Sequence, residues 1–106
     1  MKQYTSPEQT AKLIELGLFP KHIKKISDGG KMLLACSGYS IGELIEMLPR
    51  VIEGEFYNSL LAIDSDNTKW WVMYLYMGKQ KYASKSPELI DALFDMVVKL
   101  KKEGVI

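Results

Sequence analysis

The chain has 106 residues, of which 47% are hydrophobic and 25% charged, and its net charge is +1. These values suit one globular domain, exclude a wholly disordered chain, and give no general attraction to nucleic acid or membranes. A single cysteine cannot form an internal disulfide, the opening residues lack the apolar stretch of a signal peptide, and no apolar run approaches the ~20 residues of a membrane helix. We expect a single-domain, soluble cytoplasmic protein without membrane association.

Three segments carry helix signals. In "SPEQTAKLIELGLF", Ser6 and Gln9 form a capping box, Pro7 suits the first helical position and Gly17 supplies the stop. These start and stop signals predict a short amphipathic helix.

The second helix is predicted in "SIGELIEMLP". Ser40 and Glu43 form another capping box, and Pro49 ends the helix. Its apolar residues have the spacing of a buried stripe and are Ile41, Leu44, Ile45 and Leu48.

The third helix is predicted in "SPELIDALFDMVVKLKKEG", where Ser86 caps, Pro87 opens and Gly104 ends it. Acidic residues come early and lysines late, which suits the helix dipole. Its wide apolar stripe contains Leu89, Ile90, Leu93, Met96, Val97 and Leu100.

A β-hairpin is predicted between the second and third helices. Its strands span about 57–64 and 69–78, and "DSDNTK" between them is rich in turn-forming residues. The segment 31–36, "KMLLAC", fits either a third strand or a short buried helical turn. We therefore predict an α+β fold in which three amphipathic helices pack on a small antiparallel sheet.

Neither face of the strand 69–78 is polar, although one face of a half-covered strand should be. The second face is covered by a helix on each side, stays partly exposed, or binds a partner such as a second copy. We favour a symmetric homodimer, because aromatic residues are enriched in interfaces. One face carries Trp71, Met73, Leu75 and Met77. The predicted interface is the other face, with Trp70, Val72, Tyr74 and Tyr76.

Catalytic signatures are sparse. His22 has no second ligand at metal-binding spacing, and Cys36 has no local base. "DSDNTKWW" lacks the glycine and glutamate of a calcium loop, and "SDGGK" lacks the spacing of a phosphate-binding loop. Glu53 and Glu55 flank Gly54 and are typical of loop acids. We expect a non-enzymatic protein without catalytic residues, metal or cofactor.

An alternative is a nucleic-acid-binding accessory protein. Residues 1–31 and 69–106 each carry a net charge of +3, and residues 32–68 carry −5, so a basic face requires the two ends to be neighbours. Lysines would contact phosphates while the aromatic residues of the strand stack on bases. The candidate residues, from the segments 21–31 and 79–85, are Lys21, Lys24, Lys25, Lys31, Lys79 and Lys81.

Four segments together resemble a group of small uncharacterised proteins from prophages and other mobile elements of gut bacteria. They are "QTAKLIELG", "YSIGELIEMLP", "LLAIDSDNTKWWVMY" and "ELIDALFDMVVKLKKEGVI", and the resemblance covers the chain from Gln9 to Ile106. These motifs are structural, and the group has no assigned activity, so no functional residue is carried over. The resemblance implies a bacterial or phage cytoplasmic setting, an accessory role, and a phage or host protein as partner.

Overall fold

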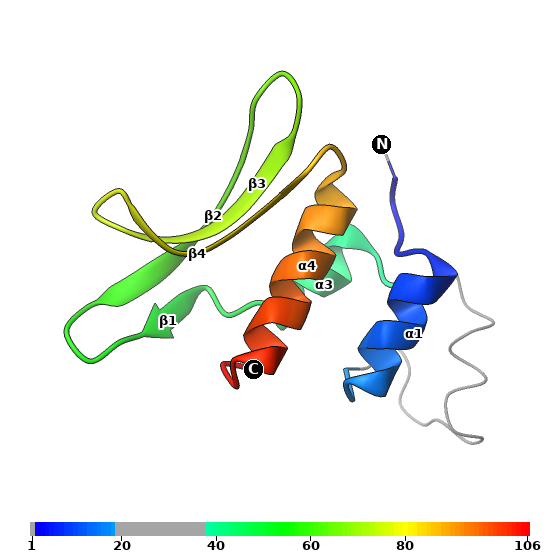
Figure 1. Cartoon of the computed structure of the whole chain (residues 1–106), viewed down its shortest axis with the longest axis horizontal. Helices are drawn as coiled ribbons and strands as arrows, with labels where there is room; N and C mark the ends of the chain where they lie inside the picture. Colours follow the sequence, from blue (N-terminus) through cyan, green and yellow to red (C-terminus); the bar gives the residue numbers. More distant parts are fainter. Residues whose placement is uncertain (1, 19–37) are drawn as a thin grey trace.

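A computed structural model describes residues 2–18 and 38–106, which form one layer of helices and one of strands (Figure 1). The strands make a four-stranded antiparallel sheet in the order β1-β2-β3-β4, so each strand pairs only with its sequence neighbours. The elements are α1 (Pro7–Glu15), α3 (Ile41–Met47), β1 (Val51–Glu53), β2 (Asn58–Ser65), β3 (Trp70–Tyr76), β4 (Lys79–Ser86) and α4 (Leu89–Lys102). The predicted α+β class is confirmed, whereas the sheet contains more strands than predicted. The segment 31–36 lies outside the described residues.

The two short helices begin at the predicted capping boxes. The Ser6 hydroxyl accepts a hydrogen bond from the backbone N–H of Gln9 at 3.1 Å, and the Gln9 side chain accepts one from the backbone N–H of Ser6 at 2.9 Å. Ser40 and Glu43 make the same pair of bonds at the start of α3. Each box satisfies backbone donors that a helix start leaves unpaired.

The predicted hairpin is formed by β2 and β3. Its turn is built around Asp66, whose Oδ1 accepts hydrogen bonds from the backbone N–H groups of Thr68 at 2.7 Å and Lys69 at 2.8 Å. The Thr68 hydroxyl adds a third bond to the same oxygen at 2.8 Å. These hydrogen bonds to the Asp66 side chain explain why the sequence of this loop favours a turn.

Strands β1 and β4 were not predicted. A two-residue turn of Met77 and Gly78 joins β3 to β4, with φ angles of 47° and 79°. Asn-Gly or Asp-Gly normally marks such turns, because both positions need positive φ. Because methionine stands at the first position, the sequence lacks the usual signal for this hairpin. The lysines of β4 are also typical of an exposed basic segment. β1 is too short to be recognised from the sequence, because it has only three residues, all of which pair with β2.

Helix α4 starts later than predicted. Ser86 is the last residue of β4, and the residue preceding the helix is Glu88, so Ser86 does not cap it. The predicted apolar stripe of this helix is buried throughout.

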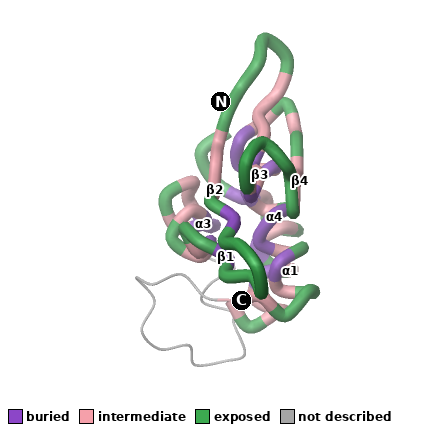
Figure 2. The backbone as a smooth tube through the Cα atoms, turned by 90° about the vertical axis from the view of Figure 1, so that its left-hand side faces the viewer, coloured by how far each residue is buried: buried purple, intermediate pink, exposed green. Residues whose placement is uncertain are grey.

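The core lies between the sheet and α4, which packs against β3, β4 and α3. Val72 and Tyr74 of β3 are fully buried there, and the ring of Tyr82 meets Tyr74 edge-on at 6.5 Å. The Ser84 hydroxyl donates a hydrogen bond to the carbonyl of Ala92 at 2.7 Å, which ties β4 to α4. Figure 2 shows the buried stretches gathered where α4, α1 and the sheet meet, with the hairpin loops exposed.

The segment before α1 is attached to the rest of the fold at two places. The backbone N–H of Thr5 donates to the carbonyl of Tyr39 at 3.0 Å, and the backbone N–H of Tyr39 donates to the Thr5 hydroxyl at 2.9 Å. The Lys2 ammonium forms an ion pair of 2.8 Å with Asp91 on α4. Gly38 permits this approach, because a Cβ there would lie 2.7 Å from the carbonyl oxygen of Thr5.

Candidate interaction surface

The two faces of β3 have different surroundings, and the predicted interface is on the face that meets the helices. Val72 and Tyr74 have no exposed surface, and Trp70 packs against the core. Only Tyr76, at the far end of the strand, is 39% exposed. The prediction of Val72 and Tyr74 as interface residues is therefore wrong for this fold, because α4 covers them.

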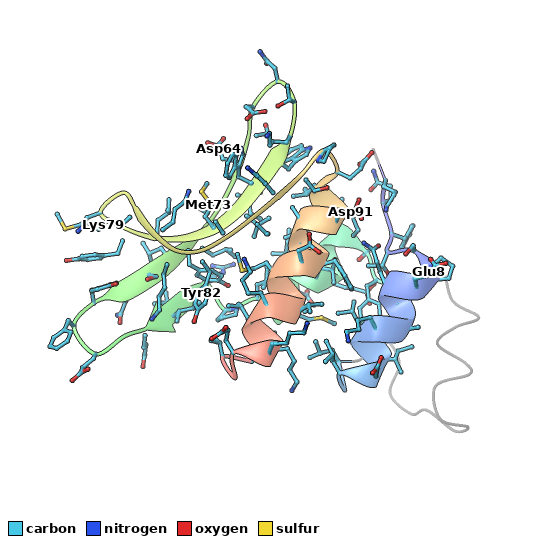
Figure 3. All side chains as sticks on the ribbon, in the orientation of Figure 1. Glu8, Asp64, Met73, Lys79, Tyr82 and Asp91 are labelled. Atoms are coloured by element: carbon cyan, nitrogen blue, oxygen red, sulfur yellow. The ribbon has the colours of Figure 1, made fainter. Side chains whose placement is uncertain are left out.

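The opposite face of the sheet is not covered by any of the described helices (Figure 1). The strand register shows which residues of the four strands share this face. We call it the open face, and its apolar residues are Val51, Leu60, Ala62, Trp71, Met73, Leu75 and Ala83. In Figure 3, Met73 points away from α4, whereas Tyr82 lies on the side of the helices.

The apolar side chains of the open face are accessible to solvent. Leu60 is 57% exposed and Val51 is 41% exposed, and the register places them side by side. Trp71, Met73 and Leu75 are half-buried. Contiguous exposed apolar surface of this kind is characteristic of interaction sites.

Trp71 is held in place at one end of the open face. Its indole N–H donates a hydrogen bond to Asp66 Oδ2 at 3.3 Å, and the ammonium groups of Lys69 and Lys85 lie 5.9 and 5.2 Å from the ring centroid. Hydrogen bonds from Thr68, Lys69 and the indole hold the pKa of Asp66 well below its usual range. The carboxylate therefore stays charged, and the indole keeps a fixed acceptor.

The far end of the sheet carries a second group of exposed apolar side chains, which we call the tip. Phe56 is 87% exposed and Met77 is 83% exposed, each in the turn between two strands. Tyr57 and Tyr76 join the two turns, because their rings stack with centroids 4.4 Å apart. The tip extends the apolar surface beyond the region that the helices cover.

Charges on the open face are divided between the two halves of the sheet. The register makes one row of Asp64 on β2, Trp71 on β3 and Lys85 on β4. Glu53, on β1, adds a second acid to the half that contains Asp64. Among residues 2–18 and 38–106 the single ion pair joins Lys2 to Asp91, so Asp64 and Lys85 have no ion-pair partner there.

Little in the described part of the chain suggests catalysis. Across its two described ranges, no three His, Cys, Asp or Glu side chains are grouped so that they could hold a metal ion. His22 and Cys36 lie outside these ranges, and Glu53 and Glu55 are exposed in β1 and the following turn. None of the helices that the structure describes combines the length and apolar character needed to cross a bilayer.

The lysines of the alternative prediction are only partly placed by the structure. Lys79 and Lys81 are exposed on β4, whereas Lys21, Lys24, Lys25 and Lys31 lie outside the described residues. Lys85 belongs to the predicted segment 79–85 and lies beside Trp71, whereas Lys69, the other lysine in contact with this ring, was not predicted. The signal available for Lys69 was its position two residues before Trp71 in the sequence.

Comparisons of the chain with protein-family models, curated proteins and solved structures found no match. The proposed function therefore rests on the open face of the sheet.

Proposed function

We propose that this chain is a non-enzymatic protein-interaction module that self-associates through the open face of its sheet. The observation that carries this proposal is an apolar patch on β1, β2 and β3 that none of the described helices covers, with Trp71, Met73 and Leu75 of β3 at its centre. Monomeric proteins seldom expose apolar patches of this kind without a use.

The composition of the open face supports binding. Tryptophan and methionine are enriched in the buried centres of protein interfaces, and tryptophan often contributes most of the binding energy. Trp71 is already fixed by Asp66 and two lysines, so little side-chain freedom is lost when a partner covers it. Burial of exposed apolar surface contributes about 25 cal/mol per Å².

The experiment that tests this proposal measures mass in solution by size-exclusion chromatography with light scattering over a range of protein concentrations. We expect the wild type to form a dimer and Leu75→Glu to be monomeric, because the substitution places a charge in the centre of the open face. Tyr4→Glu is the matched control, since Tyr4 is 47% exposed on the helix side of the molecule. A wild-type protein that is monomeric at every concentration contradicts the proposal.

The biological setting in this proposal is the cytoplasm of a bacterium or of a phage-infected cell. The resemblance of the sequence motifs to prophage and mobile-element proteins supports it. In that setting the dimer is an accessory factor, and a phage or host protein is a further partner for surfaces outside the open face.

A second candidate function is binding of single-stranded nucleic acid, which the position of Trp71 between Lys69 and Lys85 favours. An aromatic ring flanked by cations is a stacking platform for bases. Fluorescence anisotropy with a labelled oligonucleotide should then show affinity that falls steeply with salt and is lost in Trp71→Ala. Binding that Lys69→Gln with Lys85→Gln leaves unchanged contradicts this function.

A further inference from the structure

We infer that two copies pack open face to open face around a two-fold axis that runs parallel to the strands, between β2 and β3. This inference rests on the proposed self-association and specifies its geometry. In this arrangement β2 of one copy lies over β3 of its partner. The acidic half of each open face then meets the basic half of the other.

The residues that face each other follow from the strand register. Leu60 is level with Leu75, Ala62 with Met73, and Asp64 with Trp71. A two-fold axis along the strands keeps these levels and exchanges the strands. Met73 therefore lies over the small Ala62 of the other copy, which leaves room for its long side chain.

The charged row gives the strongest reason for this axis. Asp64 on β2 and Lys85 on β4 lie on opposite sides of Trp71 and at the same level. Exchange of the strands brings the Asp64 carboxylate of one copy to the β3–β4 side of the other, where Lys69 and Lys85 lie. The contact forms twice, as it must in a symmetric interface.

The other way to stack the sheet on itself places the axis across the strands. It keeps β2 over β2 and reverses the ends, so Asp64 of one copy faces the level of Leu60 in the other. A carboxylate would then be covered by an apolar side chain without a partner, which is costly. Complementary charges therefore favour the axis along the strands. Both arrangements keep the strands roughly aligned, which is one of the two common ways in which sheets pack face to face.

The size of the open face indicates how tightly the copies bind. The strands have three, eight, seven and eight residues. With about 3.3 Å per residue and about 4.8 Å between strands, the sheet covers roughly 400 Å² in projection. A standard stable interface buries about 800 Å² on each partner. We therefore expect a reversible dimer that dissociates on dilution, with the tip residues Phe56 and Met77 adding area at one end.

The test uses charge reversal in the full chain. In Asp64→Lys, each contact places the new lysine beside Lys69 and Lys85, and in Lys85→Asp each places two acids together. We expect each variant alone to dimerise at least about tenfold more weakly than the wild type, because like charges are opposed twice. A mixture of the two variants should form a heterodimer, since both contacts then join a lysine to an aspartate.

The control is a mixture of Glu8→Lys with Lys85→Asp, which matches the net charges but places the new lysine on α1, away from the open face. We expect less heterodimer there than in the complementary mixture, because one of the two contacts places acids together and Glu8→Lys dimerises with itself as the wild type does. Circular dichroism checks that each variant is folded. If Leu75→Glu abolishes the wild-type dimer but the complementary mixture stays monomeric, this geometry is wrong while self-association stands. A monomeric wild type overturns both.

Discussion

The hydroxyl of Tyr74 donates a hydrogen bond of 2.6 Å to the backbone carbonyl oxygen of Pro49. Tyr74 lies in the middle of β3, and Pro49 follows α3, so this bond joins the sheet to the end of a helix. The tyrosine that the sequence presents as a surface residue therefore helps hold the two layers together.

Removal of this hydroxyl should weaken the fold without affecting the open face. We expect Tyr74→Phe to lower the free energy of unfolding by about 1 kcal/mol, because the Pro49 carbonyl loses its partner. Urea denaturation measures the loss. Tyr76→Phe, at the exposed tip, should change stability little, and an equal loss in both variants would mean that the bond to Pro49 contributes nothing.

The same tyrosine should make the fold sensitive to alkali. Burial raises the pKa of Tyr74 from 10.0 to about 12. A raised pKa gives stability that is complete below pH 10 and is lost as pH rises towards 12. Burial, with the charge of Glu43, also raises the pKa of Tyr39. Urea denaturation at a series of alkaline pH values should therefore show falling stability, with a smaller fall in Tyr74→Phe.

Asp91 and Asp95, one turn apart on α4, should respond oppositely to substitution. Burial works against the charged form of Asp91, but hydrogen bonds from Lys2 and Gln9 and the Lys2 charge lower its pKa overall. Its stabilising effect is thus present above the usual carboxyl pKa and is lost as pH falls through the folded value. We expect Asp91→Asn to reduce the free energy of unfolding at pH 7 by up to about 1 kcal/mol. The variant should also lose less stability than the wild type as the pH falls.

Burial, together with the charge of Asp91, raises the pKa of Asp95, so its charged form costs stability once pH rises through the folded pKa. Asp95→Asn should therefore leave stability at pH 7 unchanged or slightly higher. Thermal unfolding of both variants from pH 3 to neutrality makes the comparison. Identical pH profiles would contradict the assignment of Asp91 as the anchor of the N-terminal segment.

Met77 should be replaceable with a gain in stability. Its φ of 47° is unfavourable for methionine, and its side chain is 83% exposed. Met77→Asn should raise the free energy of unfolding by roughly 1 kcal/mol, because asparagine tolerates positive φ in two-residue hairpins. Met77→Leu keeps the apolar side chain and the strain, so it should match the wild type. Dimer affinity measured on both variants would then show whether the tip takes part in binding.

The helices were predictable because their signals are local. The capping boxes at Ser6 and Ser40 and the stripe of α4 depend on residues within a few positions of one another. β4 escaped prediction because its preceding turn has methionine where asparagine is usual. The start of α4 was then placed too early, since Ser86 belongs to the strand.

Local sequence patterns could not predict which face of the sheet packs against the helices. Both faces of the strand from Trp70 to Tyr76 are apolar, so alternation alone cannot tell core from surface. The decision depends on neighbouring strands. Asp64 and Lys85 share the face of Trp71, and that information appears only once the register across β2, β3 and β4 is known.

The order of the strands has a consequence for folding kinetics. Every strand of the sheet pairs with its neighbour along the chain, so only short loops need to close before β1 to β4 can assemble. The bond between Thr5 and Tyr39 instead joins residues 34 positions apart. Because closing a longer loop costs more entropy, we expect the N-terminal segment and α1 to dock onto a sheet that has already formed. Amide protons of β2 and β3 should then gain protection from exchange before those of α1.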